Sequence, residues 1–283
     1  MTNDSGWKKL TPQQHQVIVK GGTEAPGSGA LLDHKESGTY TCARCDSPLF
    51  ISDSKFDSGC GWPSFDDSIP GAVRELPDPD GRRVEIRCMQ CDGHLGHVFV
   101  GERITEKNTR HCVNSLSIEF ESGRKQVAFF AGGCFWGVEH LLQQIDGVSK
   151  VDSGYMGGET ESPTYRQVCT GSTGHTETVR VTYDPELVDF ETLAKAFFEL
   201  HDPTQVDRQH NDVGTQYRSA VFFSGPEQEE VTRKLIKILE DQGLKVATEV
   251  SPAGIFWPAE PEHQDYLERN PNGYMCHVPK KRF

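Results

Sequence analysis

Two cysteine pairs place the strongest constraint on what this 283-residue chain can fold into. Cys42-Ala-Arg-Cys45 and Cys88-Met-Gln-Cys91 have the same internal spacing, and 42 residues separate the two pairs. Two-residue spacing lets both thiolates of a turn point at one ion, and two such turns complete a tetrahedral zinc site. The alternative is a pair of redox-active disulfides. We expect one structural Zn²⁺ per chain, because four thiolates leave no open position for chemistry.

Cysteine number and charge bear on the compartment and the partners. The chain has nine cysteines, an odd number spread over a long sequence, whereas secreted disulfide scaffolds are shorter and denser in cysteine. Its net charge is −13 and both halves are acidic, so neither half offers a basic groove for nucleic acid. The sequence has no apolar run of about 18 residues and no visible signal peptide. We therefore predict a cytoplasmic protein in a reducing compartment, without a membrane span.

The first half of the chain has the pattern of a β-rich domain. From about residue 38 to 120, short apolar runs are separated by Gly, Pro, Asp and Ser. The segments RVEIRC (83–88) and SLSIEF (115–120) alternate with period two, as half-buried strands do. We predict a mainly antiparallel β domain, preceded by a short helix with Thr11 as N-cap and Pro12 at its first position.

The second half alternates strands with helices. The clearest helices are DFETLAKAFFEL (189–200) and PEQEEVTRKLIKILEDQ (226–242), which carry cap and stop signals at their ends. The whole chain is therefore predicted to be α+β, with an α/β, mixed-sheet sandwich as its C-terminal domain. The connection at 121–126 is too short for a flexible tether. We expect domains over 1–122 and 125–283.

Two further cysteines of the first half stand near two histidines. Cys60 lies in SGCGWPSF and Cys112 in RHCVNS, while His94 and His97 lie in HLGHVF. Two histidines beside a cysteine could bind metal, but the four expected zinc ligands come from elsewhere. This leaves the histidines for proton transfer near neutral pH. They could equally be hydrogen-bonded structural groups, and the residues alone do not decide between the two.

Taken in order, CxxC, SGCGWPSF, CxxC, HLGHVF and RHCVNS resemble the zinc-containing form of methionine sulfoxide reductase B, over residues 7–120. The resemblance implies that Cys112 is the nucleophile and Cys60 the resolving cysteine. The other implied site residues are His94, His97 and Asn114 for the sulfoxide oxygen and its water, Trp62 as the wall against the substrate methyl, and Arg110 as the basic neighbour that favours thiolate.

The second half has its own cysteine at a strand-to-helix junction. Gly132-Gly133-Cys134 follows a predicted strand (126–130) and precedes a helical stretch (135–145). Unpaired N–H groups and the positive dipole end of a helix N-terminus favour thiolate. Phosphate loops use similar geometry, but no Lys-Ser/Thr follows these glycines. A structural cysteine at a tight turn remains the alternative.

The segments AFFAGGCFWGVEH and PTYRQVCTGSTGHTETVRVTYDP resemble methionine sulfoxide reductase A, and the likeness runs from about residue 125 to the C-terminus. The resemblance implies that Cys134 is the nucleophile and that Phe135 and Trp136 form the pocket for the ε-methyl group. The residues implied around the sulfoxide oxygen and the substrate backbone are Glu177 as the acid, Tyr165 and Tyr217 beside it, and Asp212 to bind the backbone or order water.

Two cysteines remain in the second half. The family carries resolving cysteines in a mobile tail, and the tail NPNGYMCHVPKKRF contains Cys276. The resemblance therefore implies that Cys276 resolves, although Met275 displaces it by one residue. Cys169, in the strand-like context QVCTG, is predicted to be a buried cysteine that acts as a small hydrophobe.

Together the two resemblances imply a bifunctional reductase of methionine sulfoxide, free or in oxidised proteins, with a B-type domain ahead of an A-type domain. A thiolate attacks the sulfoxide sulfur while an acid protonates the oxygen, which leaves a cysteine sulfenic acid. A second thiol then forms a disulfide, and an external dithiol, thioredoxin, reduces it. One site is needed per sulfoxide epimer, and we expect the C-terminal domain to take the S-epimer and the N-terminal domain the R-epimer. No organic cofactor is expected.

Two other classes of protein fit parts of the pattern. A cysteine peroxidase also uses a nucleophilic and a resolving cysteine, but it needs no aromatic pocket for a methyl group. A zinc-ribbon interaction module would explain the CxxC pairs, yet it leaves five cysteines without a use.

Overall fold

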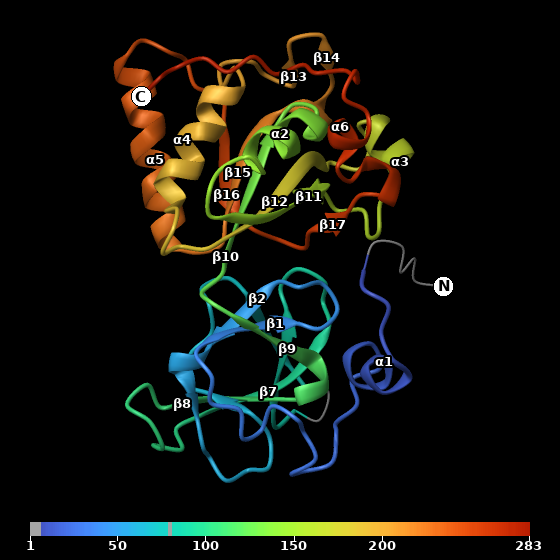
Figure 1. The fold of residues 1–283 in the computed structure, drawn as a ribbon, viewed down its shortest axis with the longest axis vertical. Helices are drawn as coiled ribbons and strands as arrows, with labels where there is room; N and C mark the ends of the chain where they lie inside the picture. The colour runs from blue at the N-terminus through green and yellow to red at the C-terminus, as the bar shows by residue number, and fades with distance from the viewer. Residues whose placement is uncertain (1–6, 79–80) are drawn as a thin grey trace. The chain divides into compact units, whose positions relative to one another are not determined.

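The structure, a computed structural model, describes residues 7–78 and 81–283. Internal contacts divide these residues into two units, Trp7–Lys125 and Gln126–Phe283 (Figure 1). Each unit has its own buried apolar core. Across these described stretches, every helix is too short or too polar to cross a bilayer.

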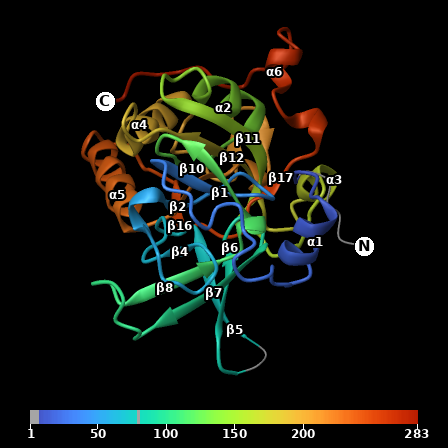
Figure 2. The same cartoon turned by 60° about the horizontal axis from the view of Figure 1, so that its bottom comes forward.

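The N-terminal unit is built from antiparallel strands, two of which, β7 and β8, run side by side in Figure 2. Its smaller sheet has the order β2-β1-β9 and its larger sheet the order β3-β4-β8-β7-β6-β5. The strands are β1 (Gly38–Cys42), β2 (Pro48–Ile51), β3 (Lys55–Phe56), β4 (Ser64–Phe65), β5 (Val73–Pro77), β6 (Val84–Cys88), β7 (His94–Val100), β8 (Thr109–Val113) and β9 (Ile118–Ser122). The short helices are α1 (Pro12–Ile18), η1 (Ser52–Ser54) and η2 (Ser115–Ser117).

Two local predictions for this unit have different outcomes. The predicted N-terminus of α1 is confirmed, because the Thr11 side chain accepts from the backbone of Gln14 and the Gln14 side chain reaches back to Thr11. The predicted strand over 115–120 is wrong in its first half, where the chain forms η2 and the strand starts only at Ile118. A buried carboxylate, that of Glu24, binds the first backbone N–H groups of η2 and favours the turn.

The C-terminal unit has one mixed six-stranded sheet in the order β16-β15-β10-β12-β11-β17, in which only β15 and β16 pair in parallel. A two-stranded ribbon, β13-β14, stands apart from it. The strands are β10 (Gln126–Gly132), β11 (Val148–Met156), β12 (Thr176–Tyr183), β13 (Arg208–Gln209), β14 (Asp212–Val213), β15 (Ser219–Phe223), β16 (Glu249–Pro252) and β17 (Trp257–Pro258). The α+β fold class is confirmed.

Alternate residues of β10 face two different apolar layers. Ala128 and Phe130 contact the core shared with the helices, whereas Phe129 belongs to a second cluster. The helices are α2 (Phe135–Leu142), α3 (Tyr165–Cys169), α4 (Phe190–Leu200), α5 (Pro226–Asp241), α6 (Tyr266–Arg269), η3 (Thr215–Tyr217) and η4 (Pro261–His263). The ends of α4 and α5 lie within one or two residues of the predicted ends, since capping and proline signals are local.

Candidate active sites and metal centre

The four cysteines of the CxxC pairs converge inside the N-terminal unit. All four Sγ atoms lie within 4.8 Å of one another, and all four side chains are buried. Two pairs from opposite turns, Cys42 with Cys91 and Cys45 with Cys88, each have a separation of 3.6 Å between their Sγ atoms. Four convergent, soft sulfur donors suit zinc in a closed tetrahedral site.

The two turns that carry these cysteines have the same backbone shape. Asp46 and Asp92 follow the second cysteine of each pair, and both are left-handed, with φ of 60° and 56°. Each donates its backbone N–H to the first cysteine of its turn, Asp46 to Cys42 at 2.9 Å and Asp92 to Cys88 at 3.0 Å. Two equivalent turns therefore direct their thiols at one point, which is the arrangement that metal ligation requires.

Cys112 lies on β8, within the larger sheet. The strand register places it between Ser64 of β4 and His97 of β7, and His97 is in turn opposite Glu85 of β6. Directly opposite residues of antiparallel strands have their side chains on the same face. The sheet thus lines up a hydroxyl, a thiol, an imidazole and a carboxylate across four neighbouring strands.

The second thiol of this site, Cys60, lies in the loop before β4, with its Sγ 3.7 Å from that of Cys112. Burial acts to raise the pKa of Cys60, but hydrogen bonds from Ser58 and Ser64 outweigh burial and lower it. Burial and the neighbouring Cys60 raise the pKa of Cys112 to about 12, against a lowering contribution from Arg110. In the reduced pair, the thiolate is therefore favoured on Cys60 and the proton on Cys112.

Arg110 is not devoted to the thiol alone. Its guanidinium forms two hydrogen bonds with Glu102, of 2.7 and 2.9 Å, and lies 4.4 Å from the centre of the Phe99 ring. The carboxylate offsets part of the positive charge near Cys112. The expected preference of Cys112 for thiolate is absent from the reduced pair because burial and Cys60 outweigh the lowering contribution of Arg110.

The two predicted histidines reach the same face of the sheet, although residues three apart on a regular strand face opposite sides. An irregularity in the β6–β7 register makes this possible. His94 Nδ1 lies 2.6 Å from Glu85, His97 Nε2 lies 2.7 Å from Asp78, and the two rings are 5.7 Å apart. Burial lowers the pKa of His94, and among the described atoms its Nε2 has no hydrogen-bond partner.

Asn114 and Trp62 both contact Glu24, a residue that the sequence motifs did not indicate. Asn114 uses both amide atoms on backbone groups: its Nδ2 donates to Leu95 O at 3.0 Å, and its Oδ1 accepts from the N–H of Glu24 at 3.0 Å. Trp62 donates its indole N–H to the carbonyl of Glu24 at 3.2 Å. The amide nitrogen of Asn114 carries a second N–H group, so it can donate to a sulfoxide oxygen while both of these hydrogen bonds remain.

In the C-terminal unit, Cys134 is the N-cap of α2 and is 7% exposed. Glu177, at the start of β12, accepts the N–H of Phe135 at 3.0 Å, so its carboxyl group lies at the same helix N-terminus. Burial raises the pKa of Glu177 to about 8, and its second oxygen has no hydrogen-bond partner among the described atoms. Burial and the charge of Glu177 also raise the pKa of Tyr165 and of Tyr217, which keeps both hydroxyls protonated. The site therefore combines one thiol with three proton donors.

The aromatic wall of this site extends beyond Phe135 and Trp136. The ring of His263 lies 5.6 Å from the Phe135 ring, 5.8 Å from Trp136 and 4.3 Å from Tyr165, while Tyr266 stacks on Trp136 at 3.8 Å. Both added rings come from the segment EHQDY near the C-terminus. The closely spaced imidazole and aromatic side chains of this segment are the sequence signal that could have indicated its place in the aromatic wall.

Glu260, two residues before this segment, supports the predicted Tyr165. Its carboxylate accepts the Tyr155 hydroxyl at 2.9 Å and the N–H of Tyr165 at 2.8 Å. A single acid thus joins β11 to the first residue of α3. No pattern in the sequence distinguishes this glutamate from its exposed neighbour Glu262.

The tail brings Cys276 to the nucleophile loop despite the extra Met275. Its side chain is 8% exposed, and its thiol is hydrogen-bonded to that of Cys134. This hydrogen bond lowers the pKa of Cys276 to about 4 and, together with burial, raises the pKa of Cys134. Asp212 of β14 also contacts Cys276, and burial raises the pKa of that carboxyl group to about 6. In the reduced pair, Cys134 holds the shared proton.

The prediction for Cys169 is wrong. The residue ends the short helix α3 rather than lying in a strand, and its side chain is exposed. The capping box of Thr164 and Gln167 starts this helix, which the strand-like run QVCTG concealed. The Cys169 thiol is hydrogen-bonded to Tyr165, whose ring lies against the site.

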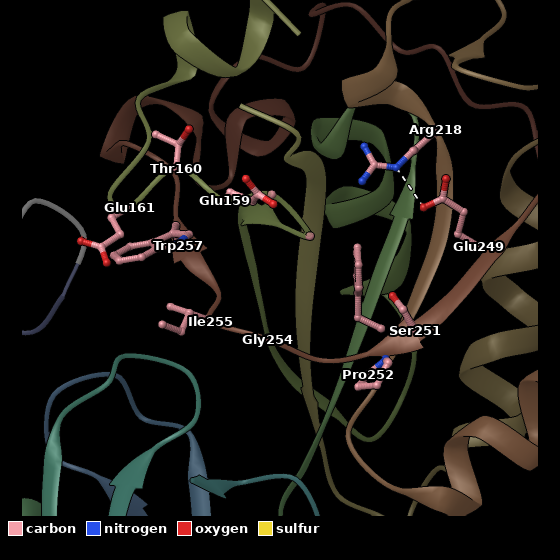
Figure 3. A pocket seen from close by; sticks show the side chains of 13 residues that line it. Glu159, Thr160, Glu161, Arg218, Glu249, Ser251, Pro252, Gly254, Ile255 and Trp257 are labelled. Atoms are coloured by element: carbon pink, nitrogen blue, oxygen red, sulfur yellow. Dashed lines mark hydrogen bonds and ion pairs between the residues drawn. The ribbon is translucent and has the colours of Figure 1, made fainter. Parts of the chain in front are cut away.

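A cavity of about 470 Å³ lies in the same unit (Figure 3). None of the described residues that line it is a cysteine. Arg218, shown there with Glu249, also donates to the carbonyls of Thr215 and Gly174 at 2.9 and 3.0 Å. These hydrogen bonds hold the loops that lead to Tyr217 and to β12. The cavity is therefore lined by residues that support the active site, and not by its cysteines.

Both units match models of known protein families. Residues 126–283 match the family model for peptide methionine sulfoxide reductase, and residues 10–122 match the model for the SelR domain. The peptide methionine sulfoxide reductase MsrA of Mycobacterium sp. (strain MCS) is 51% identical over 156 residues, which are 54% of this chain and 89% of that protein. Its counterpart in Pasteurella multocida (strain Pm70) is 49% identical over 154 residues, 54% of this chain and 88% of that protein. The crystal structure of reduced Mxr1 from Saccharomyces cerevisiae is similar to 55% of this chain and 92% of its own, with 34% identity and a TM-score of 0.53.

Proposed function

The chain belongs to the peptide methionine sulfoxide reductases, with a SelR domain preceding the reductase domain, and from this we propose that it is two reductases in one polypeptide. Residues 1–122 act on the R-sulfoxide of methionine and residues 125–283 on the S-sulfoxide. The observation that carries the proposal is that each unit pairs two thiols beside its own set of proton donors. Two unlike acid sets suit two mirror-image sulfur centres.

At the C-terminal site, Phe135 and Trp136 receive the ε-methyl group, and Asp212 binds the substrate backbone or orders water. Glu177, with Tyr165 and Tyr217, donates protons to the sulfoxide oxygen, because burial keeps these groups protonated near neutral pH. Cys134 becomes a thiolate when its proton moves to the hydrogen-bonded Cys276. Its attack on sulfur releases methionine and leaves a sulfenic acid.

At the N-terminal site, Cys112 attacks the sulfur and Cys60, 3.7 Å away, resolves the sulfenic acid. The proton that Cys112 has to lose is shared with Cys60, so one thiol activates the other. His97, opposite Cys112, and His94 serve the sulfoxide oxygen. Trp62 forms the wall for the methyl group, and its hydrogen bond to Glu24 fixes its position.

The buried CxxC cysteines would hold one Zn²⁺, which supplies cross-linking of two turns and takes no part in the reaction. An external dithiol, thioredoxin, reduces both disulfides, because each catalytic cycle ends in an intramolecular disulfide that thiol–disulfide exchange has to return to two thiols. A cytoplasmic location stays a prediction from the sequence.

We expect that single-turnover oxidation identifies both thiol pairs. The reduced full chain, given one equivalent of each separated epimer without reductant, should yield Cys134–Cys276 from the S-sulfoxide and Cys60–Cys112 from the R-sulfoxide. Peptide mass spectrometry of the alkylated protein measures both bonds. A Cys134–Cys169 bond would refute the role given to Cys276, and turnover of peroxide in preference to either sulfoxide would refute the reductase assignment.

Loss of the Glu177 proton should limit the activity of the C-terminal site at high pH. The acid is the protonated form and its pKa is about 8, so kcat/KM for the S-sulfoxide should fall as pH rises above about 8. Glu177→Gln should lower kcat/KM by about 10²- to 10⁴-fold and abolish this alkaline limb. Glu230→Gln, at an exposed position of α5, is the matched control. An unchanged pH profile in Glu177→Gln contradicts the role of Glu177 as acid.

A further inference from the structure

The cysteine of the tail is followed by a buried histidine that the mechanism above does not use. His277 is 3% exposed, its Nδ1 lies 3.1 Å from Cys276 Sγ, and its Nε2 lies 2.8 Å from the carbonyl oxygen of Gly132. Gly132 is the last residue of β10, two positions before Cys134. One imidazole therefore connects the tail thiol to the loop that carries the other thiol.

The partner of each ring nitrogen determines where the proton of the imidazole resides. A carbonyl oxygen only accepts, so the hydrogen bond to Gly132 requires a proton on Nε2. In the neutral ring the other nitrogen, Nδ1, is then an acceptor, and it faces the Cys276 thiol. A nucleophile, a base and a group that orients the base stand in line, as they do in activated-nucleophile sites.

Packing against α2 keeps the ring in this position. A Cβ on Gly137 would come within 2.2 Å of His277 Nδ1, so the ring occupies space that any other residue at Gly137 would fill. The ring lies over the first turn of α2, next to its N-cap, Cys134. The imidazole has little freedom to turn away from Cys276.

The charges around Cys276 fit a thiol that is poised to lose a proton. Its pKa is lowered to about 4, first by the hydrogen bond to Cys134 and next, among the lowering contributions, by His277. Asp212 of β14 also faces it, and burial raises the pKa of that carboxyl group to about 6. Once Cys134 has passed its proton to Cys276 and has been oxidised, that hydrogen-bond partner is lost, and the His277 imidazole is the base left in contact with the tail thiol.

We propose that His277 is the general base of the resolving step, an inference that rests on the proposed function. Nδ1 takes the proton of the Cys276 thiol while that sulfur attacks the sulfenic sulfur of Cys134. An S–S bond forms and the S–O bond of the sulfenic acid breaks. The departing hydroxyl takes up one proton and leaves as water, and His277 releases the proton that it took from Cys276, so the completed step has no net proton change. Cys276 is oxidised as the sulfenic sulfur is reduced, and no further oxidant is required.

Two substitutions of His277 separate its role as a base toward Cys276 from its hydrogen bond to the carbonyl of Gly132, which anchors the side chain. In His277→Gln, the amide nitrogen can occupy the place of Nε2 and keep the hydrogen bond to Gly132, but the side chain is not a base. His277→Asn places an amide near Cys276 and loses the anchor. His140→Gln, on α2, where the imidazole is hydrogen-bonded to the side chain of Gln144, is the matched control.

The reduced full chain is mixed with one equivalent of S-sulfoxide in the absence of reductant and quenched with dimedone. Methionine released measures the first step, and peptide mass spectrometry measures the dimedone adduct of Cys134 and the Cys134–Cys276 disulfide. Both His277 variants should release methionine at the rate of the unaltered chain and form the disulfide on the order of 100-fold more slowly, with accumulation of the adduct. His140→Gln should behave like the unaltered chain.

Disulfide formation at the normal rate in His277→Gln would overturn the proposal, even if His277→Asn were slow, because the anchor alone would then suffice. Loss of the methionine burst in both variants would also overturn it, since His277 would then serve the first step or the fold of the loop. Absence of a burst from the unaltered chain would instead refute the proposed function.

Discussion

Cys134→Ser should abolish reduction of the S-sulfoxide and leave reduction of the R-sulfoxide intact, while Cys112→Ser should do the reverse. Each substitution removes the only sulfur nucleophile proposed for its site, and a serine hydroxyl does not replace a thiolate at neutral pH. We expect a loss of about 10³-fold or more in kcat/KM for the affected epimer. The measurement is methionine formed from each separated epimer by the full chain with excess dithiol.

The exposed Cys169 provides the control for this pair of variants. Cys169→Ser removes a thiol of the same unit as Cys134 and should keep both activities within a few-fold, with any change confined to the S-sulfoxide because of its contact with Tyr165. If either nucleophile variant loses both activities, or neither, the chain does not work as two independent sites.

Cys88→Ser should unfold the N-terminal unit and spare the C-terminal unit. Structural zinc in small domains contributes about 10–16 kcal/mol of apparent binding free energy, which is comparable with or larger than the whole stability of a domain, about 5–15 kcal/mol. The variant should therefore lose bound zinc and R-sulfoxide activity and retain S-sulfoxide activity. Metal analysis, calorimetry and the two epimer assays measure these effects on the full chain.

Two comparisons keep the zinc prediction testable. Cys169→Ser should leave metal content and both unfolding transitions unchanged, since that thiol is exposed and distant in sequence from the CxxC turns. A chelator added to the unaltered chain should reproduce the effect of Cys88→Ser. One equivalent of zinc retained by Cys88→Ser together with full R-sulfoxide activity would contradict a structural role for the metal.

The N-terminal site shows where prediction from sequence ends. The motif HLGHVF suggested proton transfer by His94 and His97, but a regular strand would have placed their side chains on opposite faces. Only the irregular register of β6 and β7 brings both toward Glu85 and Cys112. That register depends on which strands pair, and strand pairing is set by the sheet as a whole.

At the C-terminal site, the local sequence predicted the position of the nucleophile but not its pKa. The motif around Cys134 predicted a thiolate at a helix N-terminus, and the helix does begin there. Its pKa is nonetheless raised, because the thiol of Cys276, far along the chain, and burial contribute more than the backbone N–H of Trp136 in the first turn of the helix, which lowers it. Likewise Glu260 and His263 were not predicted, since their importance arises from contacts with Tyr165 across nearly a hundred residues.

The sequence by itself determined the two CxxC turns, the capping box of α1, the strand-Gly-Gly-Cys-helix junction and the order of the two families of motifs. Each of these depends on backbone geometry within a few residues, where side-chain type and spacing are sufficient. The tertiary structure alone decided that Cys169 is exposed and that Glu177 is buried with its pKa near 8. These properties depend on desolvation and on charges contributed by distant segments, and no local pattern encodes either of them.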